Sequence, residues 1–195
     1  ACCNNGYIKA YDKVSYPQYV SVSSPDSVPV RVCPGDTYVV AYCEARGGPK
    51  RYLRQYYRAT GVFRDAIEIP YRTIALFNGE AGEVIGIWSE NGSSGIFVYH
   101  PEGNFLAEEY VLPQGEVFDA VPSGSNKFLI CHESGIYEYL HDIPYIPSWL
   151  GAVEANKIAF DQSRELVHLS RANVVSVYSY ENATLVDQIT VPYPV

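Results

Sequence analysis

Methionine is absent from the 195 residues, and only 18% of them are charged. We therefore expect that the first residue of translation was removed, either with a leader segment or as an initiator methionine. The low charge, together with a hydrophobic content of 47%, excludes a disordered tail. No apolar run approaches the roughly 20 residues that span a bilayer, so we expect a soluble chain with no membrane span.

Cysteine is scarce, with five residues at positions 2, 3, 33, 43 and 131. An odd number without a Cys-x-x-Cys motif does not resemble a zinc site or a dense disulfide framework. A simple turn at 34–37 would pair position 33 with 38 and position 28 with 43, so Cys33 and Cys43 would not face each other. Cys2 and Cys3 have two interpretations, a link to another chain or unpaired thiols, and we favour unpaired thiols.

Basic residues are fewer than acidic ones, and they are distributed unevenly along the chain. The net charge of −8 argues against nucleic acid as the main partner. Residues 1–72 carry 10 Lys/Arg and 6 Asp/Glu, whereas residues 73–195 carry 4 and 16, which gives balances of +4 and −12. Opposite halves predict head-to-tail docking on copies of the chain or binding of a charged partner, and uneven surface decoration is the alternative.

A pattern of paired strands recurs along the chain at regular intervals. "GIFVYHPEGNFLAEEYVLP" begins at residue 95, "GIYEYLHDIPYIPSWLG" at residue 135 and a similar segment at residue 173. Weaker copies begin at 6 and 51, and short apolar segments fill the intervals. Four short strands in a period of about 40 residues are typical of a β-propeller blade.

The sequence therefore predicts an all-β, β-propeller-like fold, with strand in more than about 40% of its residues. We expect four four-stranded blades over residues 27–70, 71–114, 115–152 and 153–195, preceded by a half-blade hairpin over residues 1–26. The missing strands of that half-blade predict that it packs elsewhere on the ring or pairs with strands of another chain.

One segment, "ELVHLSRANVVSVYSYENATLVDQITVP", resembles the YVTN-type propeller repeat. The Gly-His and Trp-Asp marks of WD repeats and the Asp-box of sialidases are absent. The resemblance implies a fold and leaves the activity open.

Residues 47–61 allow two local structures. Arg51, Arg54 and Arg58 follow one another at helical spacing, and Pro49 and Gly61 suit the two ends of a short helix. The position within the repeat predicts a strand, which we favour.

Catalytic signatures are few. The four histidines show no metal-ligand spacing, no serine lies in a nucleophile motif, and no cofactor is predicted. Glu44, Glu90, Glu133 and Arg171 fall at equivalent blade corners. Carboxylates there could bind a cation or serve a sugar hydrolase, whereas ordinary exposed corners explain them more simply.

Tyrosine is abundant, at 18 residues, and this favours contact surfaces over catalysis. Six Arg/Lys and three Tyr gather in residues 46–64, a face that favours a protein partner over nucleic acid. The candidate binding residues are Arg51, Arg54, Arg58, Tyr52, Tyr56 and Tyr57, and exchange of the three arginines for glutamate is expected to weaken assembly with the fold intact.

These features predict a non-enzymatic structural or interaction protein, with a protein partner or further copies of itself, acting in a larger assembly. By analogy with the propellers of phage tails and other virion parts, we expect a virion component, in a phage tail or associated with a capsid. An extracellular or virion location is therefore expected. The alternative is a secreted propeller that binds carbohydrate or hydrolyses glycans through corner carboxylates and tyrosines.

Overall fold

The computed structural model of this protein describes residues 2–3, 7–11, 18–23, 26–124, 126–140 and 146–192. Strands account for more than half of the chain, and the described residues form no helix. The predicted all-β, propeller-like fold is confirmed. Within these ranges there is also no helix of the length and apolarity that crossing a membrane requires.

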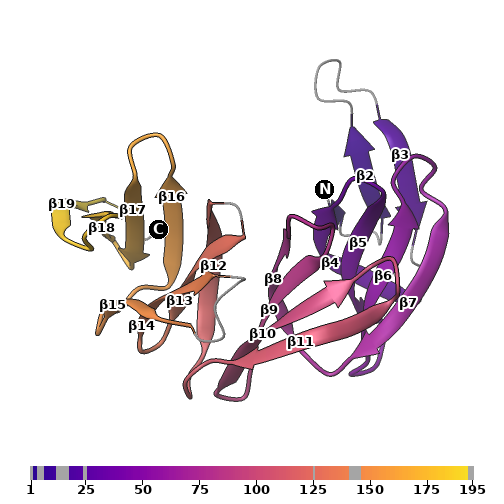
Figure 1. The fold of residues 1–195 in the computed structure, drawn as a ribbon, viewed down its shortest axis with the longest axis horizontal. Helices are drawn as coiled ribbons and strands as arrows, with labels where there is room; N and C mark the ends of the chain where they lie inside the picture. Colours follow the sequence, from indigo (N-terminus) through magenta and orange to yellow (C-terminus); the bar gives the residue numbers. More distant parts are fainter. Residues whose placement is uncertain are drawn as a thin grey trace. The chain divides into compact units, whose positions relative to one another are not determined.

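Sixteen strands form four four-stranded sheets, each with the strand order of a propeller blade (Figure 1). In every sheet the neighbouring strands are consecutive in the chain. The strands of the four sheets are β4 (Ser27–Pro34), β5 (Tyr38–Ala45), β6 (Arg51–Tyr57), β7 (Phe63–Ile69); β8 (Thr73–Asn78), β9 (Val84–Glu90), β10 (Ser93–His100), β11 (Phe105–Val111); β12 (Val117–Gly124), β13 (Lys127–His132), β14 (Gly135–Leu140), β15 (Ser148–Gly151); and β16 (Lys157–Asp161), β17 (Leu166–Arg171), β18 (Val174–Ser179), β19 (Leu185–Thr190).

The N-terminal strands form a separate three-stranded sheet of β1 (Cys2–Cys3), β2 (Tyr7–Tyr11) and β3 (Gln18–Ser23). β2 and β3 are the predicted hairpin, with Tyr7 paired to Ser23. β1 adds a two-residue strand on the other side of β2. The described residues of this sheet therefore form one strand more than the predicted hairpin.

Strand β6 lies within residues 47–61, the segment whose sequence is compatible with either a helix or a strand. It pairs along its full length with β5 and over most of its length with β7. Leu53, Gln55 and Tyr56 are buried. Because partners on both edges satisfy its backbone groups, the short-helix alternative is wrong and the strand expected from the repeat is confirmed.

The register of the β4–β5 hairpin differs from the simple turn expected. Pro34 pairs with Val39, Cys33 with Val40 and Pro29 with Cys43, with an irregularity between Pro29 and Arg31. The expected pairs of 33 with 38 and 28 with 43 are wrong because the turn lies one residue later in the chain than 34–37 and a bulge follows. Cys33 and Cys43 nevertheless do not face each other, and the side chains of Cys33, Cys43 and Cys131 are all buried. Burial raises the pKa of the Cys33 and Cys131 thiols to about 12.

An outer-strand contact recurs in three sheets. The carbonyls of Ser94, Ser134 and Asn173 accept hydrogen bonds from the amides of residues 112, 152 and 191, at 2.9, 3.3 and 2.8 Å. Asn173 is thus the structural equivalent of the serines that precede the two glycines Gly95 and Gly135. A Cβ on Gly95 would lie 2.5 Å from the Tyr110 carbonyl oxygen, so the outer strand approaches this position too closely for a side chain.

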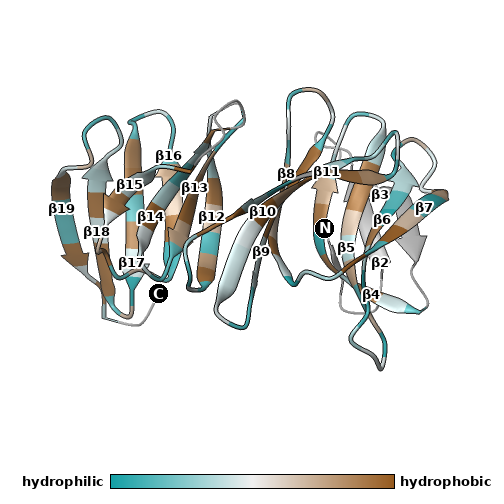
Figure 2. Ribbon diagram, turned by 60° about the horizontal axis from the view of Figure 1, so that its bottom comes forward, coloured by the Kyte–Doolittle hydropathy of each residue, from teal (hydrophilic) through white to brown (hydrophobic). Residues whose placement is uncertain are grey.

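The contacts of the chain divide it into two compact units. The first contains residues 1–86 and 97–109, and the second contains residues 87–96 and 110–195. One core cluster of the first unit contains Val39, Ala41, Cys43 and Tyr56. The second unit has a larger cluster, which includes Leu129, Ile136, Ile158 and Val167. Hydrophobic and hydrophilic residues alternate along many of the strands, as expected for sheets with distinct faces (Figure 2).

Candidate functional site

The six predicted binding residues do not share one surface. Successive side chains of β6 point to opposite faces, so Arg51 and Tyr57 lie on one face and Tyr52, Arg54 and Tyr56 on the other. Arg58 follows in the turn. Tyr56 is only 1% exposed and belongs to the core of the first unit.

Arg54 is a structural residue. Its Nη2 lies 2.8 Å from the Asp26 carboxylate, and its guanidinium lies 5.5 Å from the ring centroid of Tyr52 and 5.7 Å from that of Phe63. The arginine side chain is only 13% exposed. Glutamate at this position would place a carboxylate beside Asp26, so reversal of charge here is expected to cost stability as well as contact.

Arg64, at the end of the basic run, is also engaged within the first unit. Its Nη1 donates hydrogen bonds to the Gln55 side chain at 2.8 Å and to the Pro101 carbonyl at 2.6 Å. The amide of Gln55 donates to the hydroxyl of Tyr99 and, at 3.1 Å, to Asn104. The sequence alone does not reveal this network, because it joins residues up to 49 positions apart.

The exposed part of the predicted surface lies where β6 turns into β7. Tyr57, Val62 and Phe63 are 42%, 58% and 49% exposed. The amide of Tyr57 donates to the carbonyl of Val62 at 2.9 Å, which fixes the turn. Arg58 donates to the Gly35 carbonyl at 3.1 Å and lies 3.7 Å from the Asp36 carboxylate. We call Tyr57, Arg58, Val62 and Phe63 the β6–β7 tip.

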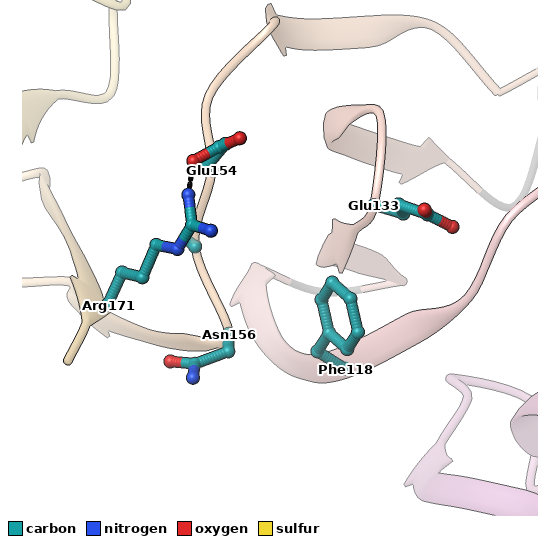
Figure 3. Close-up of a pocket in the computed structure, with 6 residues that line it drawn as sticks. Phe118, Glu133, Glu154, Asn156 and Arg171 are labelled. Carbon is teal, nitrogen blue, oxygen red and sulfur yellow. Dashed lines mark ion pairs between the residues drawn. The ribbon is translucent and has the colours of Figure 1, made fainter.

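A pocket of about 380 Å³ lies within the second unit (Figure 3). Phe118 comes from β12, Glu133 from the β13–β14 turn and Arg171 from the end of β17, while the loop before β16 contributes the rest. The lining residues are Phe118, Glu133, Glu154, Ala155, Asn156 and Arg171. The equivalent blade corners expected for Glu133 and Arg171 therefore meet at one pocket.

The other two predicted corner residues are not part of this pocket. Glu44 lies in the first unit, where the Tyr42 hydroxyl donates to its carboxylate at 2.8 Å. Glu90 ends β9. The described residues contain no group of three His, Cys, Asp or Glu side chains arranged to hold a metal ion.

The pocket lining contains more acidic than basic side chains. Glu154 and Arg171 form an ion pair on one side of it, and both side chains are more than half exposed. Phe118 and Glu133 lie on the other side, with the Glu133 carboxylate turned away from the ion pair (Figure 3). The amide of Glu116 donates to Glu133 at 3.3 Å. Two carboxylates and one guanidinium leave the pocket with a formal charge of −1.

His132 and Ser134, next to Glu133 in the chain, form a contact of the kind that serine enzymes use. The Ser134 hydroxyl lies 2.8 Å from His132 Nδ1 and 2.9 Å from the Tyr137 hydroxyl. However, the Ser134 amide donates to the same Nδ1 at 3.0 Å, so the one lone pair of that nitrogen is already engaged. Burial lowers the pKa of His132. The arrangement stabilises a turn and is poorly suited to activate a nucleophile.

Comparison with known proteins identifies a fold and no family. No family model matches the sequence, and no curated protein matches it. Among solved structures, hydrazine synthase of Kuenenia stuttgartiensis is similar over 97% of this chain and 70% of that chain, with a TM-score of 0.70 and 10% sequence identity. At this identity the likeness shows the fold alone. Because 412 solved chains match, the fold is too widespread to indicate an activity.

Proposed function

We propose that this chain is a non-enzymatic, protein-binding component of a larger assembly, and that the β6–β7 tip is a docking surface. The observation that carries the proposal is the gathering of three exposed apolar side chains, Tyr57, Val62 and Phe63, around Arg58. Aromatic residues and arginine are enriched where proteins bind each other, since they bury a large area and keep a polar end. By analogy the assembly is a virion, with the chain in a tail or associated with a capsid.

The tip is a supported surface rather than a loose loop. Phe63 packs edge-on against Tyr56 at 5.9 Å between ring centroids, and Tyr57 lies 5.7 Å from Tyr38. The side chains are thus held in place before a partner arrives, which lowers the entropy cost of binding. Since the fold accommodates both enzymes and binding proteins, the absence of catalysis is part of the proposal.

Substitution at the tip tests this function. We expect the double exchange Tyr57→Ser and Val62→Glu to weaken capture of the native partner at least about tenfold, because it removes apolar contact area and adds a charge. The melting temperature should change by only a few degrees, because both side chains are exposed. Quantitative pull-downs from the producing cells, with wild type and variant side by side, measure the difference. Equal recovery of partners by both proteins would contradict the proposal.

A second candidate, carbohydrate binding, is favoured by the pocket in the second unit. An exposed aromatic ring, Phe118, lies beside two carboxylates and the Asn156 amide, and such a set can stack on a sugar and accept hydrogen bonds from its hydroxyls. A glycan array with wild type and Phe118→Ala tests this candidate. Binding that disappears in the variant would support it, and an array without any signal would reject it.

A further inference from the structure

We propose that the pocket lined by Phe118, Glu133 and Glu154 receives Arg58 from the β6–β7 tip of a second copy of this chain. The inference rests on the proposed function, since it names the partner of the tip. It assigns a ligand to the pocket, an arginine side chain, and a source for that ligand.

The charge of the pocket selects a cation. Arg171 is paired with Glu154, whereas the Glu133 carboxylate accepts a hydrogen bond from the amide of Glu116 and forms no ion pair with the residues that the structure describes. The Glu133 side chain is exposed (Figure 3) and can turn into the pocket, so a guanidinium entering beside it would gain an ion pair without breaking one. The surrounding sequence acts in the same direction, since residues 73–195 have a balance of −12 and attract cations over distances of roughly a Debye length, about 8 Å at physiological salt.

The aromatic ring favours arginine among the cations. Phe118 is 39% exposed on the wall of the pocket. A planar guanidinium stacks on an aromatic face and also forms two parallel hydrogen bonds with a carboxylate, which the ammonium of lysine cannot do. The Asn156 side chain offers a further carbonyl acceptor for the remaining N–H groups.

Arg58 is the basic residue of the β6–β7 tip, and several neighbouring cations are engaged elsewhere. Lys50 pairs with Glu68 at 3.0 Å, Arg54 with Asp26, and Arg64 is held by the Gln55 network. The Arg58 side chain is 45% exposed, and its partner Asp36 is fully exposed at 3.7 Å, so this ion pair contributes little to stability and is easily exchanged. Tyr57, Val62 and Phe63 would bury apolar area at the rim.

The contact joins two different surfaces of identical chains. Such a heterologous interface leaves one tip and one pocket unused at the ends of each oligomer, so it continues until a ring closes or a filament grows. The chain would therefore form part of its assembly by itself.

A charge exchange tests the inference in the full chain. We expect Arg58→Glu alone and Glu133→Arg alone each to weaken self-association at least about tenfold in sedimentation velocity, because each places like charges together. The variant that carries both exchanges should recover most of the affinity, since the pair is restored with reversed polarity. Phe118→Ala should weaken association, and the matched control Glu181→Lys, which changes an exposed carboxylate outside the pocket, should not.

Three results would overturn the inference. A wild-type chain that stays monomeric at all concentrations would exclude docking between copies. If the Tyr57→Ser and Val62→Glu exchange abolishes partner capture while Glu133→Arg changes nothing, the partner is another protein, and the proposed function stands without this inference. Binding of an oligosaccharide at Phe118 by a monomeric chain would assign the pocket to glycans instead.

Discussion

Replacement of Gly135 by valine is expected to unfold the second unit at room temperature. Gly135 has φ +139°, in a region that residues with side chains rarely adopt. A Cβ at this position would lie 2.6 Å from the carbonyl oxygen of Leu150 and 3.1 Å from Cα of Gly151. These are backbone atoms of the paired strand β15, so relief of the clash requires the two strands to separate. The next residue, Ile136, is fully buried in the larger core cluster.

The expected loss of stability exceeds about 4 kcal/mol, since backbone strain adds to loss of a strand from a packed sheet. Thermal unfolding followed by circular dichroism measures it. Gly151→Ala is the matched control in the same sheet, because a Cβ there meets only the Ser148 hydroxyl, at 3.8 Å. A Gly135→Val protein that melts within a few degrees of wild type would show that the two strands are not this close.

Replacement of Gln55 by leucine is expected to destabilise the first unit by about 3 kcal/mol. The buried amide accepts a hydrogen bond from Arg64 and donates to Tyr99 and Asn104. Leucine fills the space but removes all three hydrogen bonds from a buried network, and the bond from the Arg64 guanidinium is the charge-assisted one among them. For a chain of this size the change lowers the melting temperature by roughly 6 to 12 °C.

Gln55→Glu is the informative comparison for this network. Glutamate keeps the acceptor for Arg64 and adds an opposite charge, while the Tyr99 hydroxyl can turn to donate to it. We expect the glutamate variant to lie well above the leucine variant in stability at neutral pH, and to lose that advantage as the pH falls and the carboxylate is protonated. Equal melting temperatures for the two variants would mean that the side chain contributes by volume and not by hydrogen bonding.

The fold was predictable because the pattern of short strands and turns is local in the sequence and recurs in each repeat. Residues 47–61 taken alone are compatible with a short helix, and their position within the repeat predicted the strand that is observed over 51–57. The same alignment of repeats brought Glu133 and Arg171 to equivalent corners, and both line the pocket. Register within a hairpin was less predictable, because displacement of the turn by one residue, or a bulge, shifts every pair that follows.

The site was only partly predictable, because the sequence shows that a residue is charged but not which residue it contacts. Arg54 and Arg64 look like the exposed Arg58 in the sequence, yet one contacts Asp26 and the other Pro101, which are 28 and 37 residues away. Phe118, Glu154 and Asn156 were missed because the repeats do not show which side chains line a pocket. Phe118 lies on a strand whose apolar pattern recurs in the other repeats, and Glu154 and Asn156 lie in the loop before β16.

The outer-strand contact that recurs in three sheets bears on how the chain folds during its synthesis. In each of these sheets the carbonyl and the amide that meet are separated by the same short stretch of chain, from 94 to 112, from 134 to 152 and from 173 to 191. A hairpin can therefore close as soon as about half a repeat has left the ribosome, without waiting for distant segments. Contacts this local favour rapid folding for an all-β protein, and they let each blade form on the one made before it. The ribosome would thus release the chain with most of its hairpins already closed.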